Sequence, residues 1–299
     1  MGKINLPNEI FGRPVKGAME RVLANSDPQP VVQGTNQISN SVTLDPDMQK
    51  RVLRAWQRNG LKPGQFVALY DVQGRPVQGM YGDQAVISCF ELPDMNNMNY
   101  ENTHKKLFTG TEFYMPDPFI MMNFFKGVIE AQQGGRQLFH PDGSTVNKKL
   151  VEEMYKHLTT NYKDVYGSNN PGAWAWLNAG FPEVKIDKGQ GTISGKIERV
   201  VGLNTDGTLK KDSRDLEQCL IEDRYADFDF NSQGLLIKPN GNSYEQGKNV
   251  YFWYPRQGSV ARFYADSFRA SLNCDRDPGN SDSGLGVFGC AEGADRARV

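Results

Sequence analysis

The chain has 299 residues, 38% hydrophobic and 23% charged, which is enough apolar sequence to bury a core in one large domain or two modest ones. Its formal net charge of −1 gives no electrostatic case for binding nucleic acid or a membrane surface. No apolar run approaches the roughly 18–20 residues that a membrane span needs, and no signal segment or myristoylation pattern is visible. We therefore expect no nucleic-acid partner and no membrane span, and the compartment stays open.

The first part of the chain predicts an arm and one helix. Residues 1–40 are rich in Pro, Asn, Gln and Gly and show little periodicity, which favours an extended arm. A helix begins near residues 43–45 with a capping side chain and a Pro in its first turn, and it ends at Gly60. We expect an N-terminal arm and helix over 1–64, followed by a second domain over 65–299.

Strands come next. A period of two predicts short strands at 64–72, 75–82 and 85–92, with glycine-containing turns between them. The stretch 94–102 is expected to be a polar loop.

Two helices are expected after this loop. Residues 119–131 are apolar nearly all round, and Asp117 followed by Pro is a helix start, so this helix should be buried on most faces. A second helix is expected from Ser144 or Thr145 to Leu158.

Residues 170–181 hold two tryptophans, Trp174 and Trp176. An aromatic pair spaced by two can point to opposite sides of an irregular turn and stack on sugars or bases. Packing in the core at a helix–sheet junction is the favoured interpretation.

The rest of the chain alternates between short strands and turns rich in Gly and Asn. The expected strands are 183–187, 191–202, 218–223, 234–239 and 249–254. The order of strands, two helices and more strands predicts an α+β fold.

Residues 258–291 are the most informative stretch of the sequence. Alternation at its start predicts a strand with Arg262, Tyr264 and Asp266 on one face. The inward positions are expected to be Ala261, Phe263, Ala265, Phe268, Ala270, Leu272 and Cys274. A small, polar, turn-like segment follows at 275–284, and apolar residues return at 285–288. The stretch therefore reads as a polar loop framed by strands.

The same stretch lacks five residue types. Lys, Met, Gln, Glu and Trp are absent from 258–291, although Gln257 and Glu292 stand directly outside it. A loop rich in Gly, Ser and Asp explains their absence from its middle. It does not explain their absence from the alternating strands.

In order, the stretch contains G-S, alternating residues, F-R-A, R-D-P, a polar run and L-G-V-F. This order resembles the variable region of diversity-generating retroelement proteins, and in particular the archaeal form described from Nanoarchaeota. In that family, mutation of adenines in AAY-type codons yields Asn, Tyr, Asp, Ser, Gly, Arg and Ala but none of the five missing types. The chain departs from the bacterial pattern, which has Trp where Val260 stands and ends in G-F-R instead of Gly286-Val287-Phe288. The specific match covers about the last fifty residues.

The resemblance implies a C-type-lectin-like fold, with two helices packed on a twisted antiparallel sheet and an N-terminal extension. It implies a receptor-type protein whose diversified side chains bind a protein or glycan ligand on another cell or host, with no cofactor and no catalysis. The residues carried over as exposed ligand-binding positions are Arg262, Tyr264, Asp266, Ser267, Asn273, Asp275, Gly279, Asn280, Asp282 and Ser283. Tyr254 is expected to border them.

Other positions in the stretch are expected to be structural. The frame residues are Phe263, Phe268, Leu272, Leu285 and Val287. Arg269 and Arg276 occupy matched family positions and are expected to tie the loop down by hydrogen bonds.

An enzyme is the alternative hypothesis. The formylglycine-generating oxidases have a related fold and use a cysteine pair, for which Cys274 and Cys290 are the only plausible candidates here. The default expectation for all four cysteines is a buried free thiol. A viral structural or receptor-recognition protein is a third possibility, which differs from the binder only in where it is displayed.

Other chemical motifs are weak. The match to G-x-G-x-x-G at 284–289 has no βαβ unit around it, and the phosphate-loop and calcium-loop resemblances fail in spacing or in key ligands. The three histidines are dispersed and expected to be structural or exposed. Four oxygen donors between Asp275 and Asp282 make calcium physically allowed, but a solvated loop without metal is expected.

Overall fold

The computed structural model describes residues 9–10, 13–14, 64–159, 172–266 and 268–292. The chain divides into two compact units, Met1–Gln37 and Ile38–Val299. In the first unit, β1 (Glu9–Ile10) and β2 (Arg13–Pro14) form a small antiparallel pair. The helix expected near residues 43–60 lies outside the described residues. The remaining described elements belong to the second unit.

The longest helix in the described part of the chain is the one that the sequence indicates most strongly. α4 (Pro118–Gln132) begins as predicted. Asp117 Oδ1 accepts the N–H of Ile120 at 2.9 Å, and the N–H that Pro118 lacks would have no partner within the helix at this position. Nine of its residues are buried, which confirms the expectation of a helix covered on most faces.

α5 (Lys148–Thr159) starts later than the sequence suggested. Its first turn is closed by Asn147, whose Oδ1 accepts the N–H of Leu150 at 2.9 Å. Thr145 instead forms an isolated bridge with Phe139. The prediction of a start at Ser144 or Thr145 was wrong because Asn147 provides the cap.

α3 (Tyr100–Gly110) begins inside the stretch that was expected to be a polar loop. Asn99 caps it, with Oδ1 accepting the N–H of Asn102 at 2.8 Å. Its buried stripe includes polar residues, Thr103 and His104, besides Tyr100 and Leu107. That mixed composition hides the helical period from a search for apolar residues.

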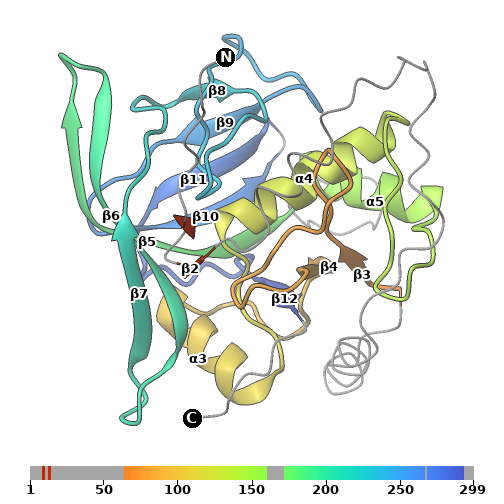
Figure 1. The fold of residues 1–299 in the computed structure, drawn as a ribbon, viewed down its shortest axis with the longest axis horizontal. Helices are drawn as coiled ribbons and strands as arrows, with labels where there is room; N and C mark the ends of the chain where they lie inside the picture. Colours follow the sequence, from red (N-terminus) through yellow and green to blue (C-terminus); the bar gives the residue numbers. More distant parts are fainter. Residues whose placement is uncertain (1–8, 11–12, 15–63, 160–171, 267, 293–299) are drawn as a thin grey trace. The chain divides into compact units, whose positions relative to one another are not determined.

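Seven strands form the main sheet, in the order β7-β6-β5-β10-β11-β9-β8 (Figure 1). The strands are β5 (Trp174–Asp187), β6 (Thr192–Leu203), β7 (Leu209–Asp215), β8 (Arg224–Ala226), β9 (Val250–Trp253), β10 (Ser259–Ala265) and β11 (Ala270–Arg276). All neighbours are antiparallel except β11 and β9, which are parallel. β10 and β11 therefore lie in the interior of the sheet, each paired on both sides.

A second sheet has the order β12-β4-β3, formed by β3 (Phe66–Ala68), β4 (Val86–Glu91) and β12 (Phe288–Ala291). Both of its strand pairings are antiparallel. β12 closes the stretch 258–291, so the end of that stretch is anchored to a strand from the start of the unit.

Three predicted strands are not strands in the structure. Residues 75–82 and 234–239 form turns and isolated bridges, and residues 218–223 have no regular secondary structure. Conversely, β7 was missed because its sequence, LKKDSRD, is almost entirely polar. It lies at the edge of the sheet, where charged residues are common.

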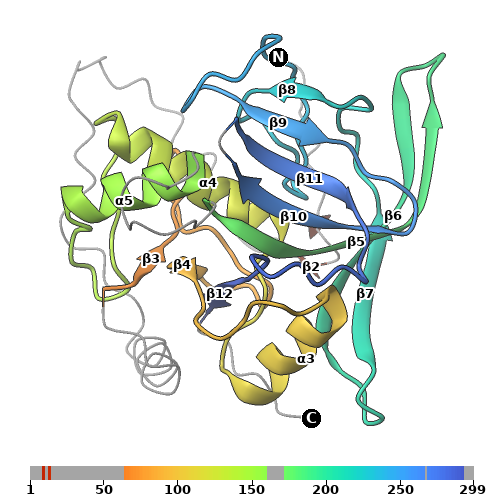
Figure 2. The same cartoon turned by 180° about the vertical axis from the view of Figure 1, so that it is seen from behind.

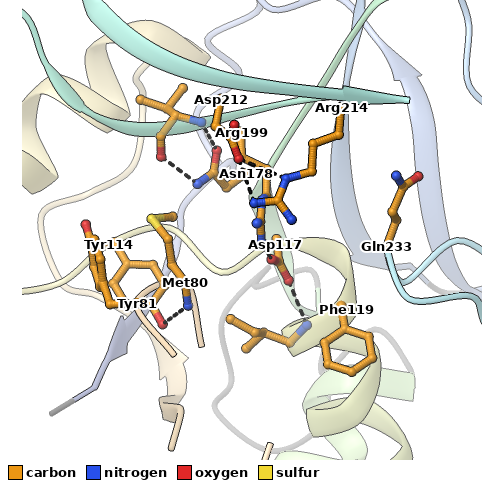
Figure 3. A network of polar contacts seen from close by, with 12 residues as sticks. Met80, Tyr81, Tyr114, Asp117, Phe119, Asn178, Arg199, Asp212, Arg214 and Gln233 are labelled. Carbon is orange, nitrogen blue, oxygen red and sulfur yellow. Dashed lines mark hydrogen bonds and ion pairs between the residues drawn. The ribbon is translucent and has the colours of Figure 1, made fainter. Parts of the chain in front are cut away.

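A buried polar network joins α4 to the main sheet (Figure 3). Asp117 Oδ2 accepts from Arg199 Nη1 of β6 at 2.7 Å. Asn178 of β5 is fully buried, and its side chain donates to the carbonyl of Val200 at 2.9 Å and accepts its N–H at 2.7 Å. These contacts fix the helix against β5 and β6.

The structure confirms an α+β fold for the described residues of the second unit, with three helices and two sheets. The hydrophobic core lies between the helices and one face of the main sheet. Phe125 of α4 and Phe263 of β10, both fully buried, have ring centres 5.0 Å apart there. The opposite face of β5, β10, β11, β9 and β8 carries the residues of the candidate site. Figure 2 shows the arrangement of these strands.

Candidate ligand-binding face

The hairpin β10–β11 separates its side chains by alternation, as the sequence predicted. Ala261, Phe263, Ala265, Ala270 and Leu272 are buried on the core side. Arg262 and Tyr264 point to the other face, and their partners across the hairpin are Asn273 and Ser271.

Strand register extends this second face across five strands. One row is Trp176, Arg262, Asn273 and Trp253, and the next is Trp174, Tyr264, Ser271, Tyr251 and Tyr225. We call these residues, except Trp176, which is fully buried, and together with Arg269 at the hairpin turn, the outer face. It is made of aromatic rings, guanidinium groups and small polar side chains.

The arginines of the outer face stack on its aromatic rings. The guanidinium carbon of Arg262 lies 4.7 Å from the ring centre of Tyr264 and 5.5 Å from that of Trp174. That of Arg269 lies 4.0 Å from the ring centre of Tyr251. Such cation–π contacts hold each guanidinium in place without supplying a hydrogen-bond acceptor.

Several polar atoms of the outer face are buried without a hydrogen-bond partner among the described residues. They are Arg262 Nε and Nη1, Arg269 Nε, Trp174 Nε1, Trp253 Nε1 and Ser271 Oγ. A buried unpaired donor costs about 1–3 kcal/mol. All except the hydroxyl are donors only, so the face has an excess of donors.

Arg262 is the most deeply placed of these charged side chains, with 8% of its surface exposed. Burial, and secondarily the nearby charge of Arg276, lower the pKa of Arg262 to about 10. That value is still well above neutral pH, so the outer face keeps this positive charge at its centre.

The polar loop after β11 is organised by its own side chains. Asp277 Oδ1 accepts the N–H of Gly279 at 2.8 Å, and Asn280 Oδ1 accepts that of Asp282 at 3.1 Å. Arg276 Nη2 pairs with Asp282 Oδ2 at 2.6 Å, so Arg276 ties the loop down as expected. Three of the four side chains considered for calcium, Asp277, Asn280 and Asp282, thus make contacts within the loop, and no metal-ligand cluster is found among the described residues.

The carried-over positions differ in exposure. Gly279 and Ser283 are exposed, whereas Tyr264, Asp266, Asp275, Asn280 and Asp282 are half-buried. Ser267 lies outside the described residues. Arg262 and Asn273, expected to be exposed, are buried at 8% and 5%. They belong to the outer face but sit at its centre, where their neighbours cover them.

Phe268 does not belong to the buried frame, contrary to the prediction. It was expected to point inward, yet 80% of its surface is exposed. The alternation fails here because the chain turns: Asp266 Oδ1 accepts the N–H groups of Phe268 and Arg269 at 2.7 and 2.9 Å. Leu285 and Val287, the frame residues after the loop, are buried as predicted.

The favoured expectation for Trp174 and Trp176 was packing in the core, and the alternative was a stacking platform in an irregular turn. Both residues lie on β5 and on the same side of the sheet, so the irregular turn was wrong. Trp176 is a core residue, fully buried, and its Nε1 donates to the carbonyl of Met98 at 3.0 Å. Trp174 is half-buried and belongs to the outer face.

Sequence reasoning did not assign Tyr225, Tyr251 and Trp253 to this face. A signal was present in the strand 250–253, where half-buried Tyr251 and Trp253 alternate with buried Val250 and Phe252. Because these residues lie outside 258–291, the resemblance did not point to them.

Two cavities are lined by residues that do not belong to the outer face. One, of about 350 Å³, is lined by Glu91, His157, Gly284 and Gly286, among others, and the second, of about 610 Å³, by residues that include Tyr100, Glu198 and Pro278. In the first, Glu91 Oε2 lies 2.7 Å from His157 Nε2, and Oε1 accepts the N–H of Trp174 at 2.8 Å. This carboxylate is occupied in joining β4, α5 and β5.

All four cysteines are buried thiols outside any disulfide among the described residues, which is the default expectation. Cys274 lies on β11 of the main sheet and Cys290 on β12 of the small sheet. Burial raises the pKa of the Cys274 thiol well above its usual value, which disfavours the thiolate that redox chemistry needs. The geometry therefore adds no support to the cysteine-based enzyme.

Comparison with protein-family models, with curated proteins and with solved structures finds no match for this chain. In the part of the chain that the structure describes, no helix is long and apolar enough to cross a membrane. Function is therefore inferred from the residues and their geometry.

Proposed function

We propose that the chain is a ligand-binding, receptor-type protein of the diversity-generating retroelement class, with a C-type-lectin-like domain that displays a diversified surface. The observation that carries this proposal is the division of residues 258–291 into a buried frame and a displayed set. Phe263, Leu272 and Leu285 are fully buried. The carried-over positions that the structure describes lie on the outer face, at the hairpin turn, at the end of β11 and in the adjoining loop.

The position of the stretch within the sheet supports the proposal. β10 and β11 are paired on both sides, and β12 is paired with β4. The backbone of the displayed segment is therefore held by hydrogen bonds that do not depend on side-chain identity. Substitutions at outer positions then change the surface with little cost in stability.

The residue types also fit display. Tyr, Asp, Ser and Asn supply adaptable hydrogen bonds and rigid contact area, as in antibody loops. The absence of Lys, Met, Gln, Glu and Trp from 258–291 matches the chemistry of adenine-directed mutation that the resemblance implies. The tryptophans of the outer face, Trp174 and Trp253, come from outside the stretch and provide a constant aromatic background.

Two libraries of this protein test the proposal. The first randomises the displayed positions 264, 266, 275, 279, 280, 282 and 283. The second randomises the frame positions 263, 272, 285 and 287. Folding is scored by protease resistance on the surface of yeast, and binding by selection on several unrelated soluble proteins.

We expect most members of the first library to fold and the selections to yield target-specific binders. We expect few members of the second library to fold, because changes at fully buried positions create cavities or strain. Equal tolerance in both libraries, or a first library that folds but yields no binders, contradicts the proposal.

A further inference from the structure

Among the described residues, two arginines of the outer face have no acidic partner. Other arginines nearby are paired: Arg256 Nη2 with Asp223 at 2.8 Å, and Arg276 Nη2 with Asp282 at 2.6 Å. In the same part of the chain, neither Arg262 nor Arg269 is within ion-pair distance of a carboxylate. Within the described part of the chain, both positive charges therefore lack an ion pair.

Aromatic side chains hold both guanidinium groups in place. Arg262 stacks on the ring of Tyr264 at 4.7 Å. Arg269 stacks on Tyr251 at 4.0 Å and on Trp253 at 5.6 Å. Guanidinium groups held in this way suit planar acceptors, which carboxylates provide.

The surroundings favour a protein partner. Trp, Tyr and Arg are the residues that dominate binding energy in protein interfaces. The exposed ring of Phe268 at the hairpin turn adds an apolar anchor beside them. Neither Arg262 nor Arg269 lines the two cavities described above.

We propose that, in this sequence, the outer face binds an acidic patch on a protein partner, with Asp or Glu carboxylates accepting hydrogen bonds from Arg262 and Arg269. This inference rests on the proposed function, since it names the partner chemistry of the same face. Two nearby carboxylates, Asp275 and Asp282, lie on the loop side of Arg262. Because like charges repel, we expect the acidic patch of the partner to bind on the side of the hairpin turn.

The test uses a random dodecapeptide library displayed on phage. It is selected in parallel on the full chain, on the double variant R262Q/R269Q and on the control R214Q. Arg214 lies on β7 of the same sheet and is paired with Asp212 at 2.8 Å. Circular dichroism and thermal melting establish that each variant is folded. Should the double variant fail to fold, R269Q at the half-buried turn position replaces it.

We expect Asp and Glu to be enriched at least about two-fold in the peptides selected on the wild type and on R214Q, and not in those selected on R262Q/R269Q. Selected acidic peptides should bind the double variant at least about ten-fold more weakly, as the loss of charge-assisted hydrogen bonds implies. Peptides that bind the wild type without acidic enrichment, or an enrichment that persists in the double variant, overturn the inference. So does binding of a heparin hexasaccharide together with a lack of acidic peptides.

The two proposals fail separately. If neutral peptides bind and are lost on substitution of Tyr264, the face is a binding surface and only the acidic preference is wrong. If acidic peptides bind as expected but the gene shows no adenine-directed variation, the charge complementarity holds and the retroelement assignment is wrong.

Discussion

The guanidinium carbon of Arg262 lies 4.7 Å from the ring centre of Tyr264, two residues further along the same strand. The pair occupies the middle of the outer face, and Trp174 covers the guanidinium from the neighbouring strand at 5.5 Å. The contact orients a charge that has no acidic partner among the described residues. A regular strand can in this way present one charged and one aromatic group in fixed relation to a ligand.

Two phenylalanines of the hairpin should respond in opposite ways to the same substitution. Phe263 is fully buried and Phe268 is 80% exposed. We expect Phe263→Ala to lower the free energy of unfolding by about 3–5 kcal/mol, and Phe268→Ala to change it by less than about 0.5 kcal/mol. Urea denaturation measures both. Similar losses in the two variants would mean that the frame and the displayed positions are not separated as described.

Asn178 is predicted to be essential for the pairing of β5 and β6 around Val200. Its buried amide satisfies both the N–H and the carbonyl of Val200 (Figure 3). Asn178→Ala leaves both unpaired, so we expect a loss of about 2–4 kcal/mol in the free energy of unfolding. Asn123→Ala is the matched control, because Asn123 makes one half-buried contact to a helix carbonyl. An equal loss in the control would argue against a special role for Asn178.

His104 should make the protein less stable in mild acid. Both of its ring nitrogens are buried without a hydrogen-bond partner in the part of the chain that the structure describes. Burial, followed by the charge of Lys211, lowers the pKa of His104 from 6.5 to about 3. Between these values only the unfolded state binds the proton. The free energy of unfolding therefore falls by about 2 kcal/mol from about pH 7 to pH 5 through this residue alone.

His104→Phe removes this titration and keeps the ring between Tyr100 and Phe108. We expect the variant to lose less stability than the wild type when urea denaturation is repeated at about pH 7 and pH 5, which bracket the unfolded-state pKa. An unchanged pH dependence in the variant would show that His104 does not titrate abnormally.

Glu292 should act in the opposite direction. Burial raises its pKa from 4.5 to about 7, although its oxygens accept the N–H groups of Tyr81 and Asp83 at 2.6 and 3.0 Å. Between these two pKa values the folded state keeps a proton that the unfolded state has lost. This residue therefore lowers the free energy of unfolding by about 2–3 kcal/mol as the pH rises from about 5 to 8.

Glu292→Gln cannot titrate, so we expect stability in the variant to decline less between about pH 5 and pH 8 than in the wild type. Glu222→Gln is the control, because the Glu222 side chain is 75% exposed. A variant that keeps the full decline would mean that another group is responsible.

Local signals in the sequence accounted for the elements that carry the site. Asp117 and the following Pro predicted the start of α4, and simple alternation along one strand separated Arg262 from Phe263. These predictions succeed because capping and a period of two are read from a few neighbouring residues. The helix around His104 and the charged strand β7 were missed, since neither has an apolar pattern.

The set of residues that forms the outer face could not be predicted from local sequence signals. Tyr225, Tyr251 and Trp174 meet Tyr264 only through strand order, including a parallel pairing of β9 and β11 that no local pattern encodes. The prediction for Phe268 was wrong because a turn interrupts the alternation on which it relied. Register between distant strands is set by the packing of the whole unit.

Deep sequencing of this gene across a natural population decides whether the outer face is a diversified surface. We expect substitutions at adenine positions within codons 258–291, concentrated at outer and loop positions such as Tyr264, Asp266 and Asn280, with the codons of Phe263 and Leu272 constant. The codons before this stretch should show no such excess. Substitutions spread evenly along the gene, or an invariant stretch 258–291, would contradict the proposal that this face is built to vary.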